Sequence, residues 1–165
     1  MYVAMSTTTD VAPVSTVRND WLQVGGVTGV LFGVTFGLLL SVGGIMPEIG
    51  AYIRMPTLLG GWLLHMAIAF TLSIAFAGIL STARFSQYAD RLRTLVPMGL
   101  AWGVVTWVVL DVFVLAYMGV AFAAPGAVFP NFAVEDAVAT LVLSVFIALF
   151  YYGTRRWLIK GPAAQ

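Results

Sequence analysis

Hydrophobic residues fill four long stretches of this chain, and polar residues separate them. The first stretch, from Leu22 to about Met46, contains no charged residue, and the stretches of about 58–80, 98–122 and 133–152 contain few ionisable residues. Each stretch has roughly the 20 apolar residues that an α-helix needs to cross a bilayer. The pattern predicts an all-α polytopic membrane protein whose four transmembrane helices lie within residues 22–153.

The segments around these stretches are short and polar. A polar tail (1–21) comes first, an inner loop (82–97) separates the second stretch from the third, and a basic tail (154–165) ends the chain. Prolines disturb the interior of a helix and therefore mark connections, and the connecting prolines are Pro47, Pro56, Pro97, Pro125 and Pro130. We expect the helices to begin and end near these limits.

The inner loop has apolar residues at helical spacing, which are Phe85, Tyr88, Ala89, Leu92 and Leu95. Its charged residues fall mostly on the other face, as is typical of a short amphipathic helix lying on lipid headgroups. The alternative is a solvated connector whose arginines serve only to orient the chain. The sequence favours neither interpretation over the other.

Composition supports a membrane location. Hydrophobic residues make up 61% of the 165 residues and charged residues only 9%, whereas a soluble domain has about 25% charged residues. The mean hydropathy is +0.97. Too few polar side chains are present to cover the surface of a soluble core. The absence of cysteine excludes disulfides, thiolate metal ligands and a cysteine nucleophile.

The distribution of basic residues predicts the orientation. All of the 8 Lys and Arg residues except Arg54 lie before the first span, in the inner loop or after the last span. Loops rich in Lys and Arg stay in the cytoplasm. We therefore expect a multi-pass protein of the plasma membrane with both termini in the cytoplasm.

Glycine recurs at every fourth position of the first span, at Gly25, Gly29, Gly33 and Gly37. In lipid, close contact between small residues draws helices together, so this stripe predicts a glycine zipper and a compact four-helix bundle. Other spans have shorter stripes, whose glycines are Gly61, Gly99 and Gly103. The groove of the first span also suits a lipid tail, a cofactor ring or a second copy of the chain, although packing within the chain is favoured.

Two ionisable residues lie well inside the predicted spans. Asp111 is near the middle of the third span, where a carboxylate costs about 2.5–3.5 kcal/mol and needs a partner. His65 lies at a similar depth in the second span, which predicts an intramembrane His65–Asp111 pair. Asp136 and Glu135 extend this line outward. The hydroxyls that complete a polar network are those of Thr106, Thr140 and Ser144.

The pair has two interpretations. In one, it forms part of a proton or ion pathway, since an ionisable residue inside a membrane is a functional candidate by default. In the other, it is a hydrogen bond that fixes the register of two helices. One histidine and one aspartate make a short relay, and no second polar cluster marks an inner gate. The sequence alone favours the structural interpretation.

Other classes of function have little support. The sequence contains no nucleophile elbow, phosphate loop or cluster of metal-binding histidines, so we expect no enzyme activity, no metal site and no cofactor. Nucleic-acid binding is not expected, because membrane topology accounts for the basic residues. A minor alternative is a b-type haem held by His65, with Met66, Met118 or the histidine of a second copy as the other axial ligand.

The segments GGWLLHMAIAFTLSIAFAGIL (60–80) and GLAWGVVTWVVLDVFVLAYMG (99–119) resemble those of small, uncharacterised four-span membrane proteins common in archaea, especially halophiles. The likeness covers most of residues 22–153. It implies a four-span fold and a membrane location, and it implies no activity. Asp111 departs from the resemblance, because an apolar residue is expected at that position.

The sequence thus predicts a non-enzymatic membrane protein that is a structural component or a subunit of a membrane complex. Its expected partners are membrane lipids, together with further copies of the chain or other membrane subunits. The alternative, from another class, is a small proton- or ion-coupled transporter or channel that uses His65 and Asp111.

Overall fold

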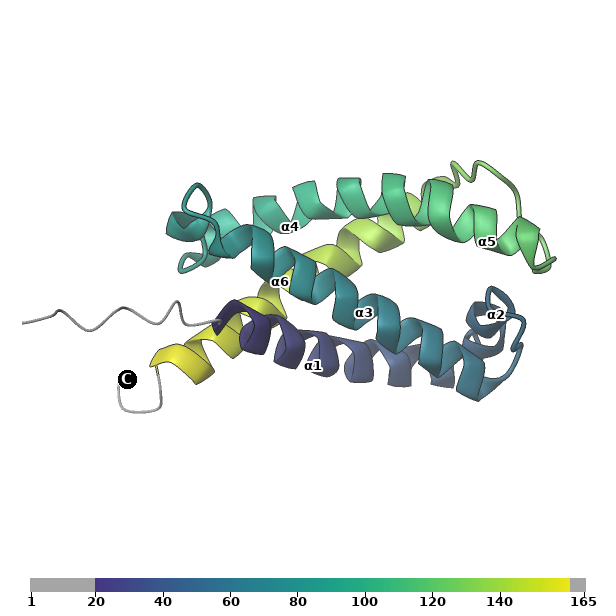
Figure 1. Cartoon of the computed structure of the whole chain (residues 1–165), viewed down its shortest axis with the longest axis horizontal. Helices are drawn as coiled ribbons and strands as arrows, with labels where there is room; N and C mark the ends of the chain where they lie inside the picture. The colour runs from purple at the N-terminus through teal and green to yellow at the C-terminus, as the bar shows by residue number, and fades with distance from the viewer. Residues whose placement is uncertain (1–19, 161–165) are drawn as a thin grey trace, which may run out of the picture.

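The computed structural model describes residues 20–160, which form helices joined by turns and contain no strand (Figure 1). Residues 1–19 and 161–165, which make up most of the predicted N-terminal tail and the end of the predicted C-terminal tail, lie outside the described residues. Within the described range, 4 helices are long and apolar enough to cross a membrane, which confirms the prediction of an all-helical chain with four apolar spans. They are α1 (Asp20–Val42), α3 (Leu58–Ser81), the continuous helix Leu92–Ala121, and α6 (Val134–Lys160).

The third span is not a uniform α-helix. It consists of α4 (Leu92–Thr106), a π-helical segment η2 (Trp107–Leu115) and α5 (Ala116–Ala121). A π-helix is rare and is frequently found at functional sites. α4 begins before the predicted limit and includes Pro97, which the sequence had placed in a connection. Pro97 lies in the second turn, so its missing N–H removes one hydrogen bond close to the start of the helix.

Two short helices lie in the connections. α2 (Met46–Ala51) follows α1 and packs against α3, and η1 (Ser86–Tyr88) is a single 3₁₀ turn between α3 and α4. The chain reverses direction after α1 at Gly44, which has a left-handed φ of +73°. The Ile45 N–H donates to the Leu40 carbonyl oxygen at 3.0 Å. This is the long hydrogen bond of a Schellman motif, which ends α1 and directs the chain into α2.

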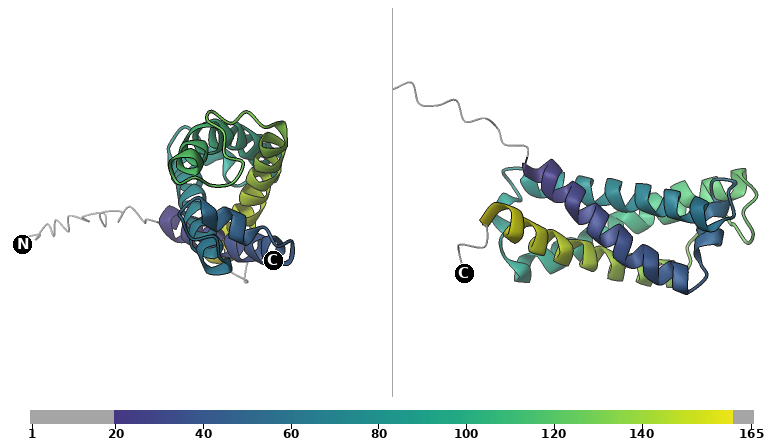
Figure 2. Two further views of the ribbon diagram at one scale, coloured as in Figure 1. Left: turned by 90° about the vertical axis from the view of Figure 1, so that its right-hand side faces the viewer. Right: turned by 90° about the horizontal axis from the view of Figure 1, so that it is seen from below.

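The spans are arranged as two pairs. α1 packs along α3, α4 packs along α6, and a smaller contact between α1 and α6 joins the pairs. The described chain begins and ends at the same end of the molecule, where the α3–α4 connection also lies; we call this the terminal end (Figure 1). α2 and α5 lie at the other end, which we call the α2–α5 end. Figure 2 shows the same arrangement end-on and from below.

The glycine stripe of α1 lies against α3. A Cβ atom at Gly29 would lie 2.7 Å from the Cα of Phe70, and one at Gly33 would lie 2.7 Å from the Sδ of Met66. These separations are shorter than van der Waals contact. At Gly29 the neighbour is backbone, so a side chain would push the helices apart, whereas at Gly33 the flexible Met66 side chain would have to move. The other predicted packing glycines also lie at contacts between elements, with Gly25 and Gly37 against α3, Gly99 and Gly103 against α6, and Gly61 against the backbone of α2.

Apolar and aromatic side chains fill the half of the molecule nearer the terminal end. The ring centroid of Phe76 in α3 lies 5.8 Å from that of Tyr151 in α6 and 6.2 Å from that of Trp102 in α4. Phe32 of α1 and Phe150 of α6 are in edge contact at 6.2 Å. The core in this half is therefore continuous across all four spans.

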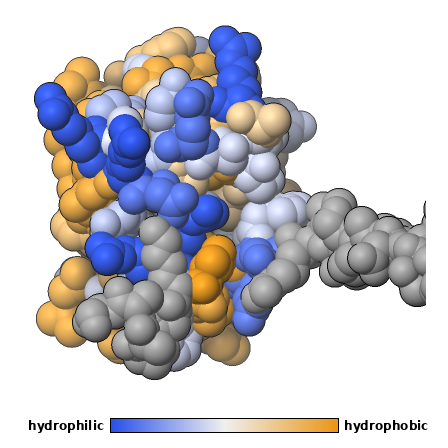
Figure 3. Space-filling view, turned by 90° about the vertical axis from the view of Figure 1, so that its left-hand side faces the viewer, coloured by the Kyte–Doolittle hydropathy of each residue, from blue (hydrophilic) through white to orange (hydrophobic). Residues whose placement is uncertain are grey.

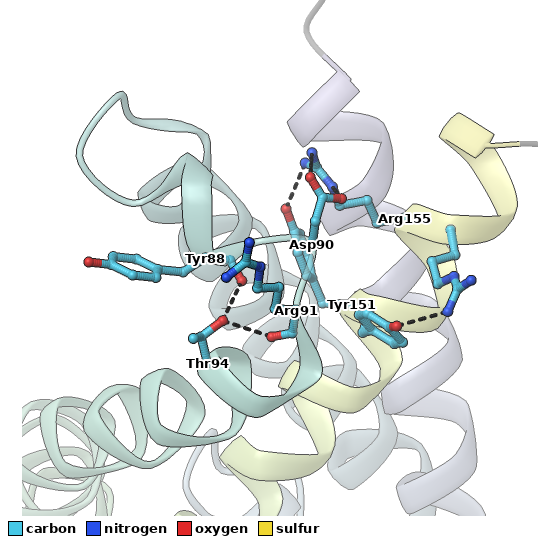
Figure 4. A network of polar contacts seen from close by, with 8 residues as sticks. Tyr88, Asp90, Arg91, Thr94, Tyr151 and Arg155 are labelled. Atoms are coloured by element: carbon cyan, nitrogen blue, oxygen red, sulfur yellow. Dashed lines mark hydrogen bonds and ion pairs between the residues drawn. The ribbon is translucent and has the colours of Figure 1, made fainter.

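The α3–α4 connection folds back onto the helix ends. Residues 82–91 contain only the η1 turn, and not the amphipathic helix considered from the sequence. Phe85 and Ala89 pack against the protein core, while Tyr88 and Leu92 stay exposed. Arg155 of α6 donates to both carboxylate oxygens of Asp90, at 3.2 and 3.4 Å (Figure 4). This ion pair holds the α3–α4 connection against α6.

Replacing Gly29 with alanine is expected to lower the melting temperature in detergent, because the new Cβ meets the backbone of Phe70 and forces α1 away from α3. Overpacking of this kind costs about 1–3 kcal/mol. Gly26→Ala is the matched control on the same helix, since its Cβ would lie 3.5 Å from the Phe70 ring, an ordinary contact. Equal melting temperatures for the two variants would contradict close packing of α1 on α3.

Candidate functional site

A cavity of about 300 Å³ lies between the two helix pairs, with walls from α1, α2, α3, the third span and α6. Most of the lining residues are apolar. The polar residues that line the cavity are His65, Thr106, Asp111, Asp136, Thr140 and Ser144. The structure therefore brings the ionisable and hydroxyl residues singled out in the sequence around one cavity.

Asp111 lies at the centre of η2, is half-buried and lines the cavity. The Thr140 hydroxyl of α6 donates to its Oδ2 at 2.5 Å. Among the described residues, no Lys or Arg forms an ion pair with Asp111. A carboxylate inside a membrane needs a proton, a cation or several hydrogen-bond donors for its stabilisation. The surrounding side chains supply the Thr140 hydroxyl and no positive charge.

His65 binds α1 instead of the third span. Its Nε2 lies 3.0 Å from the Gly33 carbonyl oxygen, and because a carbonyl only accepts, Nε2 carries the proton. Within residues 20–160, no hydrogen bond or ion pair joins His65 to Asp111, so the direct contact expected from the sequence is absent. The physical reason is that Gly33 has no side chain, which leaves its carbonyl open to the closely packed α3.

The contact with Gly33 limits how His65 could bind a haem. An imidazole nitrogen that binds iron has to be unprotonated, and because Nε2 of His65 donates to Gly33, only Nδ1 is left for this role. Met66, one of the second ligands considered, has its Sδ beside Gly33 on α1. In the part of the chain that the structure describes, no group of three or more His, Cys, Asp or Glu residues is placed to hold a metal ion.

Two further cavities adjoin this one toward the α2–α5 end. A cavity of about 190 Å³ shares Asp111 and Asp136 with it, and a wider one of about 830 Å³ shares Asp136 and reaches the exposed Glu48 and Pro125. The three cavities form a series that leads from the α2–α5 end to Asp111. Glu135, the other acidic residue that the sequence placed on this line, is exposed and lines none of the three.

Two residues that the sequence pattern did not reveal, Asn131 and Tyr52, line the cavity of about 190 Å³ in this series. Asn131 Nδ2 donates to Asp136 Oδ2 at 2.6 Å, and the Asn131 N–H donates to the Val112 carbonyl at 3.2 Å. Asn131 thereby ties the connection before α6 to η2. Burial, followed by the negative charge of Asp136, raises the pKa of the Tyr52 hydroxyl, which therefore stays protonated at neutral pH.

Thr106 lines the central cavity at the junction of α4 and η2. Its side chain is buried, with the residue only 4% exposed, and its hydroxyl has no hydrogen-bond partner among the described residues. A buried hydroxyl without a partner costs about 1–3 kcal/mol. The Thr106 hydroxyl is therefore an unsatisfied group in the cavity wall, and its oxygen has almost no accessible surface.

The cavity ends inside the molecule. Its wall toward the terminal end includes Phe32, Leu72 and Ile147, and the aromatic core around Phe76 and Tyr151 lies beyond them. The cavity series therefore leads from Asp111 to the α2–α5 end.

Comparison of the chain with protein-family models, with curated proteins and with solved structures finds no match. The resemblance to small four-span archaeal proteins therefore stays a prediction. A function has to be inferred from the cavity and its residues.

Replacing Thr140 with valine is expected to lower the melting temperature in detergent, because Asp111 loses its hydrogen-bond donor. A hydrogen bond to a charged group contributes about 1.5–3 kcal/mol. Thr140→Ser keeps the hydroxyl and is expected to retain most of the stability. If the valine and serine variants have the same melting temperature, the Thr140–Asp111 hydrogen bond does not stabilise the packing of the third span against α6.

Proposed function

We propose that this chain is a non-enzymatic, multi-pass protein of the plasma membrane whose four spans form a compact bundle. Through the cavity at Asp111 it takes up protons or small cations from the outside, as a small proton- or cation-coupled transporter does. One observation carries this proposal. A carboxylate in the middle of an apolar span lines a cavity and has a hydroxyl, but no basic residue, as its partner among the described residues.

The basic residues at the two ends support the orientation. Arg54 lies at the α2–α5 end, and hydrophilic residues gather on the terminal end (Figure 3). By the positive-inside rule, the terminal end faces the cytoplasm, both chain ends lie inside and the cavity opens to the outside. The basic residues near the terminal end are Arg84, Arg91, Arg93, Arg155 and Arg156.

The surroundings of Asp111 favour the exchange of a proton or a cation between this carboxylate and the outside. An ionised carboxylate at the centre of a span costs about 2.5–3.5 kcal/mol, and the Thr140 hydroxyl offsets only part of this free energy. A proton or a cation in the cavity offsets the rest. Glu48 and Asp136 line the cavities that lead to Asp111, and negative charge along a cleft raises the local concentration of cations.

A structural component or complex subunit, the function favoured by the sequence, is the second candidate. Its support is that each ionisable side chain joins two neighbouring helices, since His65 binds Gly33 on α1 and Asp111 binds Thr140 on α6. Its expected partners are lipids, further copies of the chain or other membrane subunits. The two candidates differ in what the carboxylate does.

Proton flux into proteoliposomes, followed with a pH-sensitive dye in the lumen, distinguishes the candidates. Asp111→Asn removes the negative charge from the cavity, and we expect its flux to fall to that of empty liposomes. Glu135→Gln removes an exposed carboxylate of α6 that lines no part of the cavity series. The flux of this control is expected to equal that of the unchanged protein.

The opposite result has an equally clear form. If the unchanged protein carries no flux and Asp111→Asn only lowers the melting temperature, the proposed transport is wrong and the structural function is supported.

The orientation is testable because the chain contains no cysteine. Ser86 and Val128 are exposed and lie at opposite ends of the spans. A membrane-impermeant maleimide is expected to label Val128→Cys in intact cells and Ser86→Cys only after lysis. The reverse pattern would contradict the proposed orientation and place the cavity opening in the cytoplasm.

A further inference from the structure

We infer that the cavity binds a small organic ammonium ion, with an apolar body and at least two N–H groups, at Asp111 and Thr106. This inference rests on the proposed function, because it names the class of cation that the outward-opening cavity takes up. It is carried by the division of the cavity wall into a polar and an apolar side, and by the buried hydroxyl of Thr106 that has no partner.

The two helix pairs give the two sides of the cavity their different chemistry. All of its hydroxyl and carboxylate groups come from the third span and α6. The side formed by α1 and α3 is apolar apart from His65, whose Nε2 is already bonded to Gly33. The apolar residues on that side are Phe32, Leu40, Ile68, Ala69 and Leu72.

An inorganic cation suits this wall poorly. Ca²⁺ takes about 6–8 oxygen ligands and Mg²⁺ demands octahedral coordination, whereas residues 20–160 contain no group of three metal-binding side chains. The water molecules of a hydrated cation would also contact the apolar side chains of Phe32, Leu40 and Leu72 on the α1–α3 side of the cavity. An organic ammonium instead places its body there and removes apolar surface from water.

The acceptors at Asp111 and Thr106 determine which ammonium group the ligand carries. Thr140 donates to Oδ2 of Asp111, which leaves Oδ1 to accept an N–H of the ammonium. The Thr106 hydroxyl is covered in the cavity wall and has no partner among the described residues, so it accepts a second N–H when its side chain turns toward the cavity. A quaternary ammonium has no N–H and leaves this hydroxyl unsatisfied. The site should therefore bind primary and secondary amines more tightly than quaternary ones.

The size of the cavity sets the size of the amine. A volume of about 300 Å³ lies at the lower limit of ligand pockets. It equals the liquid volume of about ten water molecules, at ~30 Å³ each. 2-Phenylethylamine, which combines a primary ammonium with a phenyl ring, is of this size and is the probe we choose.

Proton and amine compete for the same carboxylate. The ammonium binds ionised Asp111, so a proton held there leaves through the cavity series before the amine binds, and the site stays neutral overall. The other titratable groups along the series and across the cavity are Glu48, Tyr52, Asp136 and His65. Amine binding is expected to strengthen with rising pH until the amine itself loses its proton.

Isothermal titration of the purified protein in detergent with 2-phenylethylamine tests the inference, with protein-free micelles as the blank. We expect saturable binding by the unchanged protein and by Glu135→Gln. Asp111→Asn should weaken binding at least about tenfold, the effect of losing a hydrogen bond to a charged group. Thr106→Val should weaken it about fivefold, and Thr106→Ser should bind nearly as well as the unchanged protein.

The quaternary analogue of 2-phenylethylamine, with three N-methyl groups, tests the head group. It should bind the unchanged protein more weakly than the primary amine and lose no further affinity in Thr106→Val. Equal affinity for the two amines, or binding of the primary amine that survives Asp111→Asn, overturns the inference. If Thr106→Val does not fold, the comparison of the two amines on the unchanged protein decides the head group.

Proton flux measured on the same preparations separates this inference from the proposed function. Flux that depends on Asp111, without saturable amine binding, overturns the ammonium ligand and leaves the proposed function standing. Binding without flux supports the ligand and contradicts proton transport. The absence of both overturns both.

Discussion

The close approach of α1 to α3 is the constraint on which the rest of the structure depends. In hydrocarbon, apolar side chains gain little by leaving lipid for protein, so helices pair through close backbone contact. At Gly29 and Gly33 a Cβ would lie only 2.7 Å from atoms of α3. The same closeness brings the Gly33 carbonyl to 3.0 Å from Nε2 of His65. The glycine stripe therefore determines both the helix contact and the direction of the histidine.

The direction of the His65 side chain determines which hydrogen-bond partners are left for Asp111. Had the two side chains met, they would have satisfied each other and closed the polar network. Because His65 is bonded to α1, the hydrogen-bond partner of Asp111 is a neutral hydroxyl on α6, and its carboxylate still lines the cavity. The absence of a His65–Asp111 bond therefore favours binding at Asp111, whereas the bond itself would have favoured a structural role.

Local composition predicted the spans, because the length of an apolar stretch is a property of the sequence alone. It also grouped Thr106 and Thr140 with Asp111, since polar groups in apolar spans have to face protein. It missed α2, whose Met46 is fully buried only once α3 is in place. It missed the partner of His65 as well, because a backbone carbonyl leaves no mark on the sequence. The π-helical turns of η2 likewise shift residues away from the α-helical stripe that the spacing assumed.

The position of the core distinguishes a carrier from a channel under the proposed function. The cavity ends at Phe32, Leu72 and Ile147, and Phe76 and Tyr151 in the core beyond them are almost completely buried. The hydroxyls of Thr28, Ser73 and Thr154 lie in the same half, also buried and without hydrogen-bond partners among the described residues. Such groups would be stabilised by contact with water, which the close packing of this half excludes. Under the proposed function, a cation that enters from the α2–α5 end would cross only if the packed helices of this half separated, as one half of a carrier moves against the other.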